Sequence, residues 1–140
     1  MHAEASIFIG VPRDRAYSAY ADFEAMPRWS KKTKAVTVAK KEGNTVHLEI
    51  TSNGREVSTE MKLSPPERVE SEAETRFTWI RSVVSFEEVE GGTKVTASMD
   101  VKFKGHWGWI LKTQGRAEAE SSAQAELSSF AGYAERLLSN

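Results

Sequence analysis

The feature that most constrains the fold is a hydrophobic period of two, which holds over residues 34–103. In the clearest run, Val46, Leu48 and Ile50 alternate with polar residues, as expected for a strand with one face in a core and one in water. Turn sequences separate the runs: KEGN at 41–44, SNGR at 52–55, SPPE at 64–67 and EGGT at 90–93. Because such short connections join antiparallel neighbours, the sequence predicts a meander of about six strands.

The segment before the meander predicts one strand and two short helices. The apolar, β-branched run SIFIGV predicts a strand that Pro12 ends, and Pro12 also suits the first position of a helix. Tyr17 and Tyr20 follow at helical spacing. We expect Asp22 to cap a second short helix, which Pro27 ends.

The last part of the chain, from about residue 108 to residue 139, has helix formers and no proline, so it predicts one long helix. A sheet with one apolar face needs a cover, and only this helix is long enough to supply it. The predicted fold class is therefore α+β, with a long C-terminal helix packed on an antiparallel sheet.

Composition limits the possible functions. A chain of 140 residues with 39% hydrophobic and 28% charged residues suits one globular domain, 1–140. The net charge of −1 gives no general reason to expect a nucleic-acid partner. The chain has no cysteine, which excludes disulfides and thiolate sites. The opening residues, MHAEAS, lack signal-peptide features, and no run approaches a membrane span, so we expect a cytoplasmic protein.

Three motifs carry a resemblance to a known family. SIFIGVPRDRAYSAYADFEAMPRW resembles the opening of the START-related polyketide cyclase/dehydrase superfamily, with its Pro-x-Trp ending at Trp29. SFEEVEGGTKVTASMDV is similar to that family's last hairpin, and ELSSFAGYAERL to its helix end. The resemblance implies a helix-grip fold: a curved antiparallel sheet of about seven strands wrapped around the C-terminal helix, with two short helices after the first strand. The family includes lipid carriers, quinone carriers such as the coenzyme Q-binding branch, and cyclases, so the resemblance does not select one function.

The predicted C-terminal helix has large residues at its end and small ones in its middle. At about 100° per residue, one packing stripe contains Leu127, Phe130, Ala134, Leu137 and Leu138, preceded by Trp109, Arg116, Ala119 and Ala123. The alanines leave space that the sheet fills with Trp79, Phe77 or Phe86, or that a ligand fills. Alanine is also simply the best helix former. The resemblance favours a cavity, because family members enclose an elongated apolar pocket here.

We therefore predict a ligand-binding set made of Trp79, Phe86, Met99, Trp109, Arg116, Ala119 and Ala123. Two readings of Arg116 stay open. Its guanidinium either points into the pocket and binds a ligand carbonyl or carboxylate, or it pairs with Glu120 one turn further on.

The segment KFKGHWGWILK, at residues 102–112, places two tryptophans beside glycines and lysines. In a straight helix, Trp107, Ile110 and Leu111 fall on the side opposite Phe130. Three explanations stay open: a kink near Gly115, a contact with a partner chain, or a transient contact with a membrane or ligand at the pocket mouth. The oligomeric state does not follow from the sequence.

Catalytic machinery is not evident in the sequence. The three histidines are scattered, and His47 with Glu49 on an exposed strand face is more often solvated than metal-bound. Gly-x-Ser-x-Gly and Walker motifs are absent, so no catalytic residue, metal or cofactor is predicted.

The predicted function is binding of a small hydrophobic ligand (a lipid, a quinone or a polyketide-like aromatic) by a non-catalytic carrier. One alternative is a polyketide cyclase or dehydratase in which Arg116, Gln114 or Arg81 polarises a carbonyl. Another is a regulatory protein-interaction module. An acid–base pair inside the pocket favours the enzyme, and a wholly apolar pocket favours the carrier.

Overall fold

The structure is a computed structural model that describes the backbone of residues 1–105 and 108–139 and the side chains of residues 1–105 and 115–137. Strand β1 (His2–Ile9) is followed by helix α1 (Arg13–Ala21) and the 3₁₀ helix η1 (Phe23–Arg28). Six strands come next: β2 (Thr33–Glu42), β3 (Thr45–Ser52), β4 (Arg55–Ser64), β5 (Arg68–Glu74), β6 (Thr78–Val89) and β7 (Gly92–Phe103). Helix α2 (Gly108–Ser139) is the last element.

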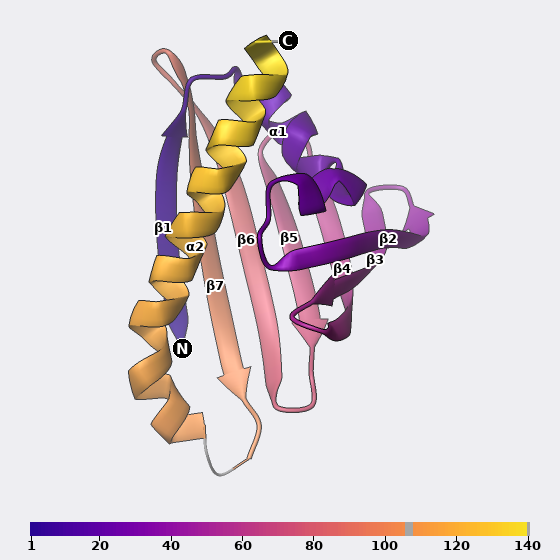
Figure 1. The fold of residues 1–140 in the computed structure, drawn as a ribbon, viewed down its shortest axis with the longest axis vertical. Coiled ribbons are helices and arrows are strands. Elements are labelled where there is room, and N and C mark those ends of the chain that lie inside the picture. Colours follow the sequence, from indigo (N-terminus) through magenta and orange to yellow (C-terminus); the bar gives the residue numbers. More distant parts are fainter. Residues whose placement is uncertain (106–107, 140) are drawn as a thin grey trace.

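The strands form a seven-stranded sheet in the order β1-β7-β6-β5-β4-β3-β2, and every neighbouring pair is antiparallel. Figure 1 shows that the sheet curls, so that β2 runs across the direction of β6 and β7, while α2 lies along one face over β1 and β7. Helices α1 and η1 lie on the same side of the sheet as α2 (Figure 1). The predicted meander and the α+β helix-grip arrangement are thereby confirmed.

The turn sequences explain how the meander folds back on itself. Asn53 (φ 52°) and Gly54 (φ 77°) both adopt positive φ between β3 and β4, which is the geometry that two-residue hairpins require. Glycine tolerates this region without a steric cost, and asparagine tolerates it better than most residues. The SNGR segment therefore fixes the pairing of Ser52 with Arg55 and hence the register of β3 on β4.

The helical boundaries after β1 differ in detail from the prediction. Pro12 precedes the first residue of α1 instead of occupying it, and the Asp22 side chain makes no capping hydrogen bond to η1. Pro27 lies inside η1 and does not end it. Proline is tolerated there because the turns on either side use the N–H groups of Ala25 and Trp29, which bond to the carbonyls of Asp22 and Met26.

The packing stripe of α2 is confirmed between Ala123 and Ala134. Leu127, Phe130 and Ala134 are buried against the sheet. Leu137 was expected to continue the stripe, but it is 49% exposed. The last turn of α2 extends past the end of β1 (Figure 1). Leu138 lies outside the described side chains.

Aromatic rings fill the core beneath the C-terminal half of α2. The ring of Tyr20 is at the centre, with centroid distances of 5.4 Å to Phe130, 5.7 Å to Phe86 and 5.9 Å to Trp29. Trp29 also packs edge-on against Phe130 at 5.1 Å. These contacts close one end of the space between α2 and the sheet.

Candidate ligand cavity

A cavity of about 290 Å³ lies between α2 and the inner face of the sheet. Its roof includes Ala123, Leu127 and Phe130 of α2, and its floor comes from β1 and from β3 to β7. Most of the side chains that line it are apolar, among them Ile50, Met61, Ile80, Val84, Ala97 and Met99. A space of this kind, apolar and bordered by a few polar groups, is typical of small-molecule sites.

The cavity exists because small residues face one another across the core. On the floor, Ser71 of β5 pairs directly with Ser82 of β6, and Met61 and Met99 flank this pair on the next strands. Ala123 faces the sheet from α2, where a larger side chain would fill the space. The predicted small-residue segment of the helix thus has a counterpart in the sheet, which the sequence analysis missed.

The predicted ligand-binding residues divide between the cavity and other places. Met99 and Ala123 line the cavity, whereas Ala119, one turn earlier on α2, is half-buried and does not. Phe86 is buried at 3% exposure and belongs to the aromatic cluster at the end of the cavity. The side chain of Trp109 lies outside the described residues, as do those of Trp107, Ile110 and Leu111.

The structure places three further candidates away from the cavity: Trp79, Arg116 and Phe77. Trp79 lies on the outer face of the sheet, where the ammonium of Lys102 is 5.2 Å from its ring centroid. The reason is strand parity: Phe86 points inward, and a residue seven positions away in the same strand must point outward. Arg116 is exposed, and its Nε lies 3.7 Å from Glu120 Oε1, so the ion-pair reading is confirmed. Phe77, considered as a core filler, is 58% exposed.

The aromatic end of the cavity carries polar groups. Ser30 is buried, and its hydroxyl donates to the carboxylate of Glu126, 2.8 Å from Oε1 and 3.0 Å from Oε2. This bond ties the segment after η1 to α2, and Glu126 lines the cavity. Burial raises the pKa of the Tyr20 phenol, and the nearby Glu126 carboxylate raises it further. Tyr20 therefore stays protonated at physiological pH.

Glu126 also borders the outside of the molecule. A surface groove of about 760 Å³ runs along α2 and is lined by Lys31, Lys32, Glu126 and small residues of the helix. Glu126 therefore borders both this groove and the cavity, and its carboxylate is held by the Ser30 hydroxyl.

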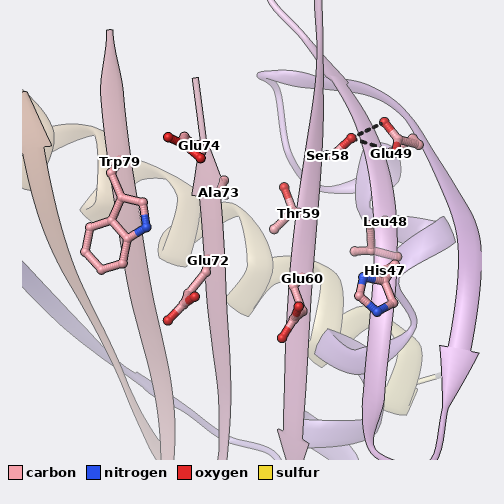
Figure 2. Close-up of a pocket in the computed structure, with 10 residues that line it drawn as sticks. All are labelled: His47, Leu48, Glu49, Ser58, Thr59, Glu60, Glu72, Ala73, Glu74 and Trp79. Carbon is pink, nitrogen blue, oxygen red and sulfur yellow. Dashed lines mark hydrogen bonds between the residues drawn. The ribbon is translucent and has the colours of Figure 1, made fainter. Parts of the chain in front are cut away.

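A second hollow, of about 300 Å³, lies on the outer face of the sheet. Figure 2 shows Trp79, Glu72, Glu60 and His47 on four neighbouring strands, with α2 behind the sheet. Glu49 accepts a hydrogen bond from the Ser58 hydroxyl at 2.7 Å. Among the described residues, no cluster of three or more His, Cys, Asp or Glu side chains is arranged to bind a metal. We regard this hollow as a solvated polar face, because charged carboxylates border it and it lies outside the core.

One pair in this hollow gives a testable prediction about stability. Glu60 and Glu72 are directly opposite each other on β4 and β5, and like charges in this position are destabilising. Glu60→Gln should therefore raise the free energy of unfolding by about 0.2–1 kcal/mol. Glu72→Gln removes the same repulsion and should give a gain of similar size, because each carboxylate also has a basic neighbour: Lys62 Nζ at 3.9 Å from Glu60, and Arg81 opposite Glu72. Urea unfolding measures both, and a gain for Glu60→Gln that does not shrink in high salt would contradict the electrostatic explanation.

The carbonyl-polarising groups considered for an enzyme are not gathered at the cavity. Arg81 lies on the outer face of the sheet, opposite Glu72 and Asp100. Arg116 is on the exposed side of α2, and Gln114 lies outside the described side chains. Among the side chains that the structure describes, Tyr20 and Glu126 are the titratable ones that line the cavity. Neither was predicted, and for Glu126 the reason is that its contact with Ser30 joins residues 96 positions apart.

The strand order and the long C-terminal helix define a helix-grip fold, and comparison with known proteins agrees with this fold. Residues 1–135 match the family described as polyketide cyclase / dehydrase and lipid transport, and the chain belongs to this family. No curated protein matches the sequence.

Solved structures share the fold at low sequence identity. TTHA0849 from Thermus thermophilus is 17% identical, with a TM-score of 0.85 over 98% of this chain and 99% of that one. The Zhui aromatase/cyclase from a Streptomyces species is 14% identical, with a TM-score of 0.84 over 99% and 95%. A START superfamily protein from Mycobacterium smegmatis is 16% identical, with a TM-score of 0.75 over 97% and 98%. Among the described residues, no helix has the length and apolar character needed to cross a membrane.

Proposed function

We propose that this protein binds a small hydrophobic molecule in the cavity under α2 and acts as a non-catalytic carrier or chaperone. The observation that carries the proposal is the apolar cavity between Met99 on the sheet and Ala123 on the helix. Burial of an apolar ligand there contributes about 25 cal/mol per Å² of surface removed from water. The family description, which includes lipid transport, supports this choice, and a lipid, a quinone or a polyketide-like aromatic is the expected cargo.

Filling the cavity tests the proposal. Ala123→Leu places a larger apolar side chain in the cavity, so we expect binding of the neutral fluorescent probe N-phenyl-1-naphthylamine to fall by about tenfold or more, with thermal stability unchanged or raised. Ala119→Leu, one turn earlier on α2 and outside the cavity lining, is the matched control and should keep probe binding. A loss of about 1–3 kcal/mol in Ala123→Leu would indicate overpacking of a full core and count against the cavity.

The natural cargo can be sought directly. Native mass spectrometry of gently purified protein should show a mass increase that disappears on denaturation, since an apolar cargo has no covalent bond to the chain. The same measurement on Ala123→Leu should show the unliganded mass. A bound species that is equally abundant in the variant would place the cargo elsewhere.

A second candidate function is a cyclase or dehydratase acting on such a ligand. The observation that favours it is the presence of a protonated phenol, Tyr20, and a carboxylate, Glu126, at one end of the cavity. A proton donor and a proton acceptor in one site are the requirements of general acid–base catalysis. Conversion of a poly-β-ketone substrate analogue that is lost in Glu126→Gln would favour the enzyme over the carrier.

A further inference from the structure

A hydrogen-bond donor that no other group of the fold uses borders the aromatic end of the cavity. Trp29 lines the cavity and is only 7% exposed, and its indole N–H has no hydrogen-bond partner among the described residues. Buried donors in native proteins are generally paired, so an unpaired one needs an explanation. The rings of Tyr20 and Phe130 pack against the indole, at 5.9 Å and 5.1 Å between centroids. Its Nε1 atom is covered by neighbouring atoms, so a small turn of the indole towards the cavity is needed before an acceptor on a ligand completes its hydrogen bonding.

The same end of the cavity is negatively charged. The carboxylate of Glu126 accepts from Ser30, and none of the described residues that line the cavity is Lys, Arg or His. A second carboxylate placed here would lose its hydration and face a like charge without a compensating cation. The cavity is therefore poorly suited to a free fatty acid or another anionic ligand head.

Tyr20 adds a second neutral donor. Its phenol stays protonated because burial and the Glu126 carboxylate both raise its pKa and so disfavour the phenolate. Two donors and one fixed negative charge favour a ligand head that accepts hydrogen bonds without carrying a charge.

We propose that the cavity selects a neutral hydrophobic ligand bearing a carbonyl-type acceptor, which receives the Trp29 N–H, and that Glu126 excludes ligands bearing a carboxylate. This inference rests on the proposed function, because it names the chemical class of the ligand for the same cavity. It assigns specificity to two residues on different elements, one after η1 and one on α2.

Three naphthalenes with substituents of similar size test this specificity: 2-acetylnaphthalene, 2-ethylnaphthalene and 2-naphthoate. Their affinities are measured by displacement of N-phenyl-1-naphthylamine from the full chain. We expect the ketone to bind about fivefold tighter than the hydrocarbon, in line with one net hydrogen bond. The carboxylate should bind at least about tenfold more weakly than the ketone, because it faces Glu126.

Substitutions at Trp29 and Glu126 test the role of each residue separately. Trp29→Phe removes the N–H and keeps a ring, so the ketone should lose its advantage over the hydrocarbon. Trp79→Phe is the matched control on the outer face, and it should keep the wild-type preference. Glu126→Gln retains an oxygen that accepts from Ser30 and removes the charge, so the affinity for 2-naphthoate should rise about tenfold.

The outcomes distinguish a failure of this specificity proposal from a failure of the proposed carrier function. Equal affinities of ketone and hydrocarbon for the wild type, or a ketone preference that persists in folded Trp29→Phe, would overturn the role of Trp29. An unchanged affinity of Glu126→Gln for 2-naphthoate would overturn the role of Glu126, and this arm does not require Trp29→Phe to fold. If the folded wild type binds neither the probe nor any of the naphthalenes, the proposed carrier function itself is wrong.

Discussion

Phe130→Ala is expected to lower the free energy of unfolding by about 3–5 kcal/mol, the usual cost of truncating a buried phenylalanine. Phe130 is 0% exposed, and its ring packs against both Tyr20 and Trp29. Removing the ring leaves a void next to an existing cavity, so the surrounding side chains have little to collapse onto. Because domains of this size are stable by only about 5–15 kcal/mol, the loss is a large share of the total. Urea unfolding followed by circular dichroism measures it.

The same helix offers a control for this experiment. Leu137→Ala also truncates a large apolar side chain on α2, but Leu137 is 49% exposed, so we expect a loss within about 0.5 kcal/mol. A loss below about 1 kcal/mol for Phe130→Ala would mean that α2 does not pack on the aromatic cluster as described. Phe130→Ala should also admit bulkier ligands than the wild type, since Phe130 forms part of the cavity roof.

The fold could be predicted from the sequence because its main determinants are local. Alternation in runs such as Val46–Leu48–Ile50 and turn pairs such as Asn53–Gly54 specify antiparallel strands without any knowledge of tertiary contacts. The long helix is predicted from composition. Its position is predicted because the apolar face of the sheet has to be covered and only this helix is long enough to cover it. The details that differed, at Pro12, Pro27 and Leu137, all lie near the ends of helices, where the outcome depends on packing against the rest of the chain.

The site was predicted only in part, and parity explains one error. Met99 and Ala123 were placed at the cavity because each lies on the inward face of its own element. Trp79 and Phe86 could not both line it, since they occupy opposite faces of β6. The same alternation could have found Ser82, which lies at an inward position between Ile80 and Val84. A small polar residue in an inward row of a strand is a usable signal of a cavity.

The polar groups at the aromatic end of the cavity could not be predicted, because residues far apart in the sequence form this end. Nothing local to Ser30 indicates that its hydroxyl binds Glu126, which is 96 residues further along. The position of Trp29 beside Tyr20 depends on the path of η1, which is irregular. The proposed membrane or protein contact through Trp107, Ile110 and Leu111 remains a prediction, since those side chains lie outside the described residues.

Gly92→Ala is expected to lower the free energy of unfolding by about 2–3 kcal/mol, towards the upper end of the usual cost of overpacking. A Cβ atom at Gly92 would lie 2.2 Å from the carbonyl oxygen of Ile9 and 3.1 Å from Gly10 Cα. Both are backbone atoms, so a side-chain rotation cannot relieve the clash, and the end of β1 has to move away from β7. The buried hydrogen bond that the Thr93 hydroxyl donates to the Val11 carbonyl, at 2.7 Å, lies next to this clash.

Gly10→Ala is the matched control for Gly92→Ala, because a Cβ at Gly10 meets nothing within 4 Å. We expect it to change the free energy of unfolding by no more than about 0.5 kcal/mol. Urea unfolding compares the two variants, and amide hydrogen exchange at Val11 reports whether the Ile9 carbonyl is displaced locally. Displacement of this carbonyl should speed exchange at Val11, whose N–H bonds to it at 2.8 Å. Equal stability of the two variants would mean that the β1–β7 edge yields to an added methyl group, and the close approach of these backbones would then not be what requires glycine at position 92.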